Sequence, residues 1–457
     1  MPRTAPSTHP TSTDALVHER WWPIAFTVDL AAEQLHRVIV DGEAFVLFRD
    51  ATGALRGMED RCPHRLARLS DGRLQGGEVE CLYHGWRFAG DGACSHIPQL
   101  EQGASIPTAA CVRTIRVVER QGIVWLHVGD DGEGNDNEIP NIDDLEAFDC
   151  HTIDFSMDLP YGHDYLIENV LDYAHIHIAH DGVRGGGSQA LAGPLAFALS
   201  ELTPQGFSAH LGRSVGGELS TGELHAAEAA FRAPGLVHYR SIYPKDASGK
   251  TKISGLALYA VPLGPGRCRL LYRAYSNFAT SRDRRRPRFW EHGYQCHLLE
   301  QDMAVVAGQA ATIASLSESL GKSWLPLKSS DALVIAYRTW VDRFATHRPD
   351  YIGLRTRASD GDDTVATVPE QFPDRFTSHV RQCASCQQAL RVAHRLRRIC
   401  DGVAFVLLAA AACTGSWEAV VFATLAVVSL FVGIGMRWLV RRLTGRGPAL
   451  RDVCPRP

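Results

Sequence analysis

Two short runs decide the first part of the fold: Cys62-Pro63-His64 and, after sixteen intervening residues, Cys81-Leu82-Tyr83-His84-Gly85-Trp86-Arg87-Phe88. Each run places one cysteine and one histidine two or three residues apart. Two cysteines with two histidines can hold a mononuclear zinc ion. The same four side chains can hold a [2Fe–2S] cluster, with both cysteines on one iron and both histidines on the other. Ligand types and spacing leave both options open.

The segments around these runs predict a small all-β domain over residues 19–129. Residues 44–48 and 54–58, joined by the turn 50–53, predict one hairpin. Residues 115–119 and 123–128 predict another. The acidic, glycine-rich stretch 130–140 that follows is typical of a linker.

The next segment predicts a second, α+β domain over residues 141–390. A helical stretch at 165–180 precedes a series of strand-like runs, and a long helix is expected at 289–317. The expected strands are 207–211, 225–232, 237–243, 253–261 and 267–278. Helices flanking an antiparallel sheet define this fold class.

A second set of possible metal ligands lies in the helical stretch. The run 168–180 contains Asp172, His175, His177 and His180. Two histidines and one carboxylate can occupy one face of Fe(II) and leave positions open for oxygen and substrate. On an ideal helix, His177 and His180 would share a face better than His175 and His180. Spacing alone therefore does not select the histidine pair.

The composition excludes several classes of protein. The chain has 457 residues and a formal net charge of −4, which argues against a nucleic-acid partner held by bulk electrostatics. Twelve cysteines in this length do not form a dense disulfide scaffold. The polar residues 1–18 are expected to be disordered, and the amino terminus lacks the apolar core of a secretory signal. We therefore expect a reducing compartment.

The carboxy-terminal part predicts a membrane anchor over residues 391–446, followed by a tail at 447–457. Residues 402–415 and 419–436 are two apolar runs separated by Ser416-Trp417-Glu418, and arginines flank both outer ends. Such a pattern predicts a transmembrane helical hairpin with both ends on the cytoplasmic side. The alternative is a helical hairpin buried in a soluble core. Multi-pass anchoring in a bacterial inner membrane, or facing the stroma in a plastid, is the expected localisation.

Just before this segment, Cys383 and Cys386 form a C-x-x-C pair. Such a pair indicates redox or metal chemistry. A second cysteine pair does not occur nearby in the sequence, so a four-cysteine zinc site is not expected. We interpret Cys383 and Cys386 as a candidate redox-regulatory pair.

The run 81–88 resembles the signature of Rieske proteins, and 168–180 resembles the ligand helix of Rieske oxygenases, with the pattern D-x-x-H-x-x-x-x-H. The first resemblance favours a [2Fe–2S] cluster over zinc and implies the ligands Cys62, His64, Cys81 and His84. The second implies that His175 and His180 bind a mononuclear iron, with a carboxylate from the segment 299–303. The candidate for that carboxylate is Asp302, with Glu300 as its competitor. In the family, the aspartate matching Asp172 bridges two subunits, which implies a homotrimer with electron transfer between chains.

The order of the motifs resembles the pheophorbide a oxygenase group more narrowly. A Rieske domain, a helix-grip-like iron domain, a C-x-x-C pair and an apolar hairpin follow one another here. The resemblance implies a mono- or dioxygenase that uses O2, a ferredoxin with its reductase, a lipophilic substrate and the lipid bilayer. The stretch 182–198 departs from the group, so the substrate stays open between a pheophorbide-like tetrapyrrole, a sterol and a tripyrrole. The alternative function is a membrane-tethered Rieske electron carrier or a redox-regulated component.

Overall fold

The computed structural model describes residues 20–129, 134–183, 186–215, 218–220, 222, 224–245, 249–345, 348, 350–356 and 372–445. The predicted tails at 1–18 and 447–457, and residues 130–133 of the predicted linker, lie outside the described residues. The chain divides into two compact units. Unit 1 comprises the described residues of Met1–Arg284 and Val305–Val368, and unit 2 those of Arg285–Ala304 and Pro369–Pro457.

The amino-terminal part of unit 1 consists of three small sheets. Their strand orders are β1-β11-β10, β2-β3-β4-β9 and β5-β6-β7-β8. The strands are β1 (Arg20–Phe26), β2 (His36–Val40), β3 (Glu43–Arg49), β4 (Leu55–Glu59), β5 (Arg73–Gln75), β6 (Glu78–Glu80), β7 (Arg87–Phe88), β8 (Cys94–His96), β9 (Thr114–Ile115), β10 (Val117–Arg120) and β11 (Ile123–Val128), and a short η1 (Thr27–Asp29) follows β1. Both predicted hairpins are therefore confirmed.

Strand β3 lies between two hydrophobic cores, which explains why the middle of its sequence is apolar without interruption. Phe45 and Leu47 face one hydrophobic core, and Val46 and Phe48 face another. Successive side chains of a strand point to opposite faces, so a strand between two cores must be apolar at every position. The second of these cores includes Cys62 and Cys81 and supports the two motif loops.

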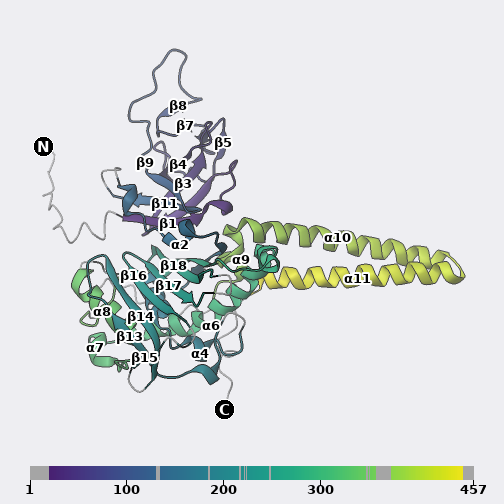
Figure 1. Cartoon of the computed structure of the whole chain (residues 1–457). Helices are drawn as coiled ribbons and strands as arrows, with labels where there is room; N and C mark the ends of the chain where they lie inside the picture. The colour runs from purple at the N-terminus through teal and green to yellow at the C-terminus, as the bar shows by residue number, and fades with distance from the viewer. Residues whose placement is uncertain are drawn as a thin grey trace. The chain divides into compact units, whose positions relative to one another are not determined.

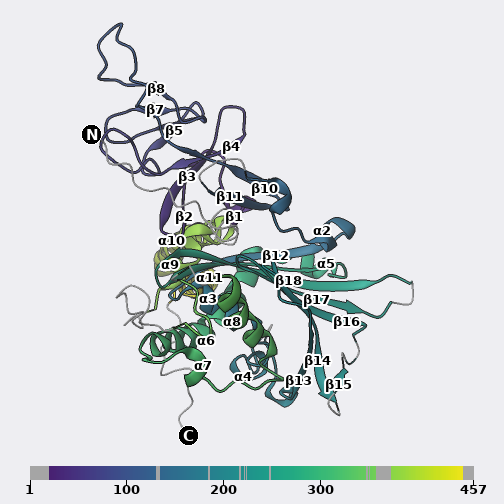
Figure 2. The ribbon, with the colours of Figure 1, turned by 90° about the vertical axis from the view of Figure 1, so that its left-hand side faces the viewer.

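The rest of unit 1 is built on an eight-stranded antiparallel sheet, of order β12-β19-β18-β17-β16-β14-β13, with β15 paired to β14 (Figure 2). Its strands are β12 (His151–Leu159), β13 (Leu195–Leu199), β14 (Gly206–Val215), β15 (Glu218–Ser220), β16 (Ala226–Arg232), β17 (Leu236–Tyr243), β18 (Lys252–Gly264) and β19 (Arg267–Ser276). All five predicted strands are present, whereas β12, β13 and β15 were not predicted. The α+β class is confirmed.

The two faces of this sheet have different partners. On one face, Ile253 and Tyr259 share a hydrophobic core with Trp22 and Trp125 of the amino-terminal strands. On the other face, the Tyr239 hydroxyl donates to the Val170 carbonyl of a helix. The helical elements of unit 1 are η2 (Asp136–Glu138), α2 (Asp143–Ala147), α3 (His163–Leu171), α4 (Ile176–Ala179), η3 (Gln189–Leu191), α5 (Ser281–Arg284), α7 (Leu320–Ser323) and α8 (Ala332–Phe344). This second face carries α3 and α8 (Figure 2).

One long helix, α6 (Arg288–Ala314), is shared between the units: residues up to Ala304 belong to unit 2 and Val305 onward to unit 1. It confirms the predicted long helix at 289–317. The other elements of unit 2 are α9 (Arg375–Ser378), η5 (Val380–Gln382), α10 (Ala384–Cys413) and α11 (Ser416–Thr444).

Helices α10 and α11 lie side by side and run antiparallel (Figure 1). The Ser429 hydroxyl donates to the Cys400 carbonyl, and Arg437 pairs with Asp401 at 2.7 Å. The connection is at Thr414 and Gly415, whereas the predicted turn residues 416–418 begin α11. Within the described residues, one helix, at Trp417–Thr444, is long and apolar enough to cross a membrane. The predicted transmembrane hairpin is therefore supported for α11 only, because α10 is apolar over a shorter stretch and charged before it.

Candidate metal centres

Two loops of unit 1 carry the first set of predicted ligands. Cys62 and His64 follow β4, and Cys81 and His84 lie between β6 and β7. Each loop closes on its own cysteine: the Leu66 amide donates to the Cys62 carbonyl, and the Gly85 amide donates to the Cys81 carbonyl, both at 2.9 Å. Gly85 has a φ of 74°, a left-handed conformation that glycine adopts without strain.

The four side chains of these loops are brought together. Cys62 and Cys81 are buried, and the rings of His64 and His84 lie 4.4 Å apart between centroids. Trp86 stacks on His64 at 4.7 Å with an interplanar angle of 3°. Burial, with the neighbouring Cys81, raises the pKa of the Cys62 thiol to about 11.

The donor set fits an iron–sulfur cluster. The Nδ1 atom of His64 is buried and has no hydrogen-bond partner among the described residues. An uncompensated buried ring nitrogen is costly, and a bound iron would satisfy it. Thiolate ligation would equally account for the burial of both cysteines.

The second predicted set begins where a helix breaks. The predicted helical stretch 165–180 is two helices, because α3 ends at Leu171 and α4 begins at Ile176. His175 is the N-cap of α4 and His180 is its C-cap. The two rings lie 5.3 Å apart, and His180 is buried. The five-residue spacing is awkward only on one straight helix, and this segment is not one.

The neighbours of His175 have distinct roles. The Asp172 carboxylate accepts from the Ala174 amide at 3.0 Å, and its Oδ2 lies 3.7 Å from Nδ1 of His175. The same Nδ1 also contacts the Asp172 carbonyl. His177 is turned to another partner, because its Nδ1 accepts from the Ser188 amide at 3.3 Å.

Helix α3, which precedes the histidine pair, is fixed by a buried ion network. Arg338 of α8 is fully buried and donates to Glu168 at 2.5 Å and to Asp164 at 2.9 Å. Gln309 of α6 donates to the other oxygen of Glu168 at 2.7 Å. Burial raises the pKa of Asp164. Both carboxylates are therefore satisfied within unit 1, and their partners come from two further helices.

The two candidate carboxylates lie on α6 in unit 2. Both oxygens of Glu300 accept from Arg375, at 2.5 and 2.6 Å. Asp302 is buried. Glu300 is therefore occupied by an arginine, which favours Asp302 as the residue that could serve a metal.

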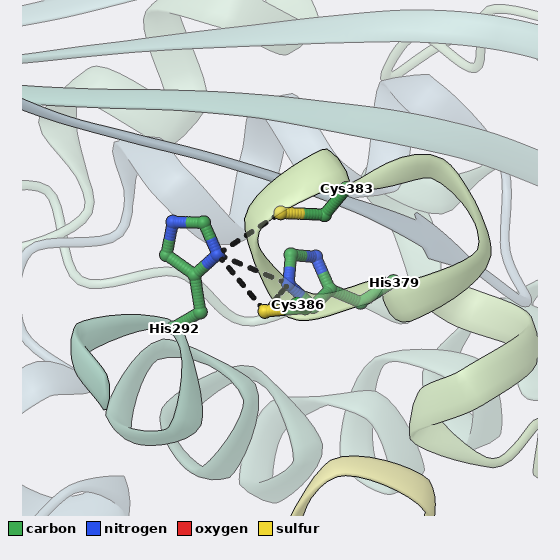
Figure 3. Close-up of side chains that lie close together, drawn as sticks. All are labelled: His292, His379, Cys383 and Cys386. Atoms are coloured by element: carbon green, nitrogen blue, oxygen red, sulfur yellow. Dashed lines mark hydrogen bonds between the residues drawn. The ribbon is translucent and has the colours of Figure 1, made fainter. Parts of the chain in front are cut away.

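A third cluster in unit 2 contains two histidines that sequence reasoning missed. His292 of α6, His379 and the C-x-x-C pair Cys383 and Cys386 converge on one point (Figure 3). All four side chains are at most 1% exposed. Burial lowers the pKa of His292, and the hydrogen bond from Cys386 is the largest cause that lowers the pKa of Cys383. The sequence signal that could have found His379 is the H-x-x-x-C-x-x-C spacing of residues 379–386.

A cavity of 730 Å³ in unit 1 is separate from these ligand sets. It is lined by Asp144, His238 and Arg240 among others, and none of its lining residues belongs to the sets above. The Asp144 carboxylate already accepts from Arg240 and from the Tyr275 hydroxyl. We therefore do not assign this cavity to the metal chemistry.

Comparison with known proteins agrees with this inventory. Residues 20–116 match the Rieske [2Fe-2S] domain family, and residues 231–319 match the Pheophorbide a oxygenase family. Protein TIC 55 of Arabidopsis thaliana is 31% identical over 438 residues, covering 90% of this chain and 80% of that protein. The chain belongs to the Rieske-type oxygenases of the pheophorbide a oxygenase family.

Two further proteins are similar to this Rieske-type oxygenase in sequence or in fold. Pheophorbide a oxygenase of Arabidopsis thaliana is 28% identical over 416 residues, covering 84% of this chain and 74% of that protein. Dicamba monooxygenase shares the fold, with a TM-score of 0.59 at 19% identity over 72% of this chain and 98% of that one. The Rieske domain implies a [2Fe–2S] cluster, and the oxygenase fold implies a mononuclear iron site. The enzyme is accordingly an oxidoreductase.

Proposed function

We propose that this enzyme oxidises a lipophilic substrate with O2, using electrons that a ferredoxin and its reductase deliver. The name of its relative, pheophorbide a oxygenase, makes a pheophorbide-like tetrapyrrole the first substrate to test. The observation that carries the proposal is the presence, in one chain, of the four convergent Rieske side chains and the His175–His180 pair. When bound, the cluster and the iron supply the electron transfer and oxygen activation that side chains alone do not perform.

In this proposal Cys62, His64, Cys81 and His84 hold the cluster. Leu66, Leu82 and Tyr83 of the two loops are exposed. Exposed apolar side chains next to a redox group offer a docking surface for a protein partner. We assign this surface to the electron donor or to a neighbouring subunit of a homotrimer.

His175, His180 and Asp302 are the proposed iron ligands. Asp302 shares a face of α6 with Gln309, because seven residues are close to two turns of a helix. Gln309 binds Glu168, and Glu168 belongs to the helix that leads into His175. Since Nδ1 of His175 faces Asp172, a metal would be bound through Nε2. Two histidines and one carboxylate are a ligand set for Fe(II).

Asp172 is proposed to orient His175 and to carry the electron-transfer bridge between subunits. Its carboxylate is fixed by the Ala174 amide, and burial raises its pKa. A carboxylate beside the second nitrogen of a ligating imidazole sets its tautomer and its orientation. The neighbouring chain would provide the cluster histidine on the other side of the bridge.

Helix α11 supports attachment to a membrane. Exposed aromatic and aliphatic side chains cover the helix pair, among them Phe405, Phe431 and Ile434. A soluble protein rarely exposes a continuous apolar surface of this kind. We propose that α11 and the apolar end of α10 enter the bilayer, with the basic ends of both helices on the cytoplasmic or stromal side, where a lipophilic substrate is also concentrated.

The test is metal analysis followed by turnover of the full chain in detergent. About three irons and two acid-labile sulfides per chain are expected, as one cluster plus one mononuclear iron require. With reduced ferredoxin, the enzyme should then incorporate oxygen from isotope-labelled O2 into pheophorbide a, and mass spectrometry of the product measures this incorporation. A sterol and a tripyrrole serve as competing substrates. About two irons with no incorporation into any substrate would instead identify an electron carrier.

A further inference from the structure

The cluster of His292, His379, Cys383 and Cys386 is built from separate pieces of unit 2. His292 lies in the first turns of α6, and His379 is the C-cap of α9. Cys383 precedes α10 as its N-cap, and Cys386 lies in its first turn. The side chains meet although 87 residues separate the two histidines. The oxygenase chemistry proposed above does not use them.

The distances between the four ligand atoms match a tetrahedral site. Nδ1 of His292 lies 3.2 Å from Nε2 of His379, and 3.4 Å from each of the two sulfurs. Nε2 of His379 lies 3.2 Å from the Cys386 sulfur. A tetrahedral zinc ion with ordinary bond lengths requires about 3.3 Å between two nitrogens and about 3.6 Å between nitrogen and sulfur. The observed separations are within a few tenths of an ångström of these edges.

Hydrogen bonding alone explains this arrangement poorly. One nitrogen of His292 has three polar neighbours at nearly equal distance, and a ring nitrogen carries at most one proton. The four groups are packed in a small apolar core with Val380, Leu443 and Phe289. A divalent ion with two thiolates and two neutral imidazoles has no net charge, so the complete site can be buried at little electrostatic cost.

We propose that these four residues bind a structural zinc ion. The chemistry selects zinc because two thiolates and two imidazoles in a closed tetrahedron are a usual structural zinc set. All four positions are filled by the protein, which leaves no open position for substrate. The cysteines are both free thiols in this structure and belong to the site as ligands.

The zinc would join the start of α6 to the start of α10. Two further contacts support the same junction: Arg375 pairs with Glu300 of α6, and the Arg442 guanidinium lies 4.7 Å from the centroid of Trp290. Asp302 is on the same helix, ten residues after His292. The ion would therefore hold the helix that bears the proposed iron carboxylate against the base of the apolar helix pair. This inference concerns a different ion and does not depend on the iron assignment.

The first experiment measures zinc in the full chain, purified in detergent without added metal. About one zinc per chain is expected, in addition to iron. Replacement by Co²⁺ should give the visible absorption of tetrahedral cobalt and a thiolate-to-cobalt charge-transfer band. A chain without zinc whose Cys383 and Cys386 are found as a disulfide would overturn the proposal and support a redox pair. A fourth iron per chain in place of zinc would also overturn the proposal.

Variants then locate the ion. Cys383→Ser should lose nearly all zinc while the visible spectrum of the Rieske cluster is retained. His379→Cys keeps four ligands and should retain the metal with a stronger charge-transfer band after cobalt exchange, which separates loss of a ligand from loss of the fold. Cys268→Ala removes a buried cysteine that lies outside the cluster and should keep the full zinc content. Unchanged zinc in Cys383→Ser would refute the assignment, whatever the iron content or activity of the enzyme.

Discussion

Replacing Arg338 with methionine tests whether the buried ion network holds the helix that leads to the histidine pair. Arg338 is fully buried on α8 and binds both Asp164 and Glu168 of α3. It also donates to the Ile352 carbonyl at 2.6 Å. Methionine is unbranched and fills the space of the arginine stem, so the main change is the loss of the charged guanidinium and its donors.

The expected loss of unfolding free energy is set by the two buried carboxylates that lose their arginine partner. Removing one partner of a buried ion pair costs roughly 3–5 kcal/mol of the free energy of unfolding, because the remaining charge is buried without compensation. Glu168 keeps its bond from Gln309, so Asp164 loses more. For a domain of this size, the loss corresponds to a fall in Tm of roughly 10 °C.

The assay is thermal unfolding of the full chain followed by tryptophan fluorescence at several pH values. Burial already raises the pKa of Asp164 above its ordinary value of 3.8. An acid whose pKa is higher in the folded state loses stabilising free energy as the pH rises through the interval between the two values. The deficit of the variant should therefore be larger at pH 7 than at pH 5.

Two controls bracket this result. Arg49 pairs with Glu119 through two hydrogen bonds, but both side chains are partly exposed, so Arg49→Ala should cost at most about 1 kcal/mol. Combining Arg338→Met with Asp164→Asn and Glu168→Gln removes the stranded charges and should recover much of the loss. If Arg338→Met unfolds at the wild-type temperature, or if its deficit grows at pH 5, the network does not have the role assigned to it.

Four further predictions address the metal sites and the anchor. His84→Cys should retain the cluster and lower its reduction potential in a redox titration, since thiolate replaces imidazole; an unchanged potential would contradict the ligand assignment. His180→Ala should lose the mononuclear iron and turnover with the cluster spectrum intact, whereas His177→Ala should keep its iron. Asp172→Asn should slow re-oxidation of the pre-reduced cluster by roughly 10–100-fold with iron still bound, and a wild-type rate would refute the bridge. Residues 405–432 can be replaced with a short Gly-Ser loop, because Gly433 of α11 lies beside Asp401 of α10. The shortened chain should stay in solution without detergent and keep its metals; aggregation without detergent would show that the exposed apolar surface lies elsewhere.

The strands that could be predicted from the sequence are of two kinds. In one, apolar and polar residues alternate, and in the other, apolar residues follow one another without interruption. Strand β12 was missed because its sequence, HTIDFSMDL, places aspartates where a strand is not expected. In the sheet Asp154 lies opposite Arg273 and Asp158 opposite Arg269, and each pair forms two hydrogen bonds. Such cross-strand ion pairs make charged residues compatible with a strand, but the partner lies more than one hundred residues away.

The candidate metal ligands also differ in whether the sequence signal for them is local or comes from distant residues. The Rieske motifs are local, so spacing and residue type suffice to identify four candidates. The choice of His175 over His177 rested on the resemblance to the family, because a continuous helix would favour His177 with His180. The break between α3 and α4 removes that objection to the five-residue spacing. For Cys383 and Cys386, the sequence showed half of a site. Its other half comes from His379 nearby and from His292, 87 residues before His379, and no local pattern marks His292.

Helix α6 shows why the burial of an aspartate in a helix is hard to predict from the sequence. His292, Cys296 and Glu300 recur every four residues and occupy one side, where they meet the cysteine cluster and Arg375. Asp302 is two residues beyond Glu300, about 200° around the helix, and therefore lies on nearly the opposite side. Both sides are buried, as His292, Glu300 and Asp302 all show. A helix buried on two sides has no single apolar stripe, so its polar residues read as solvent-facing in the sequence. Their burial is what makes them informative, because a buried polar side chain needs a hydrogen-bond partner, an ion-pair partner or a metal to remain there.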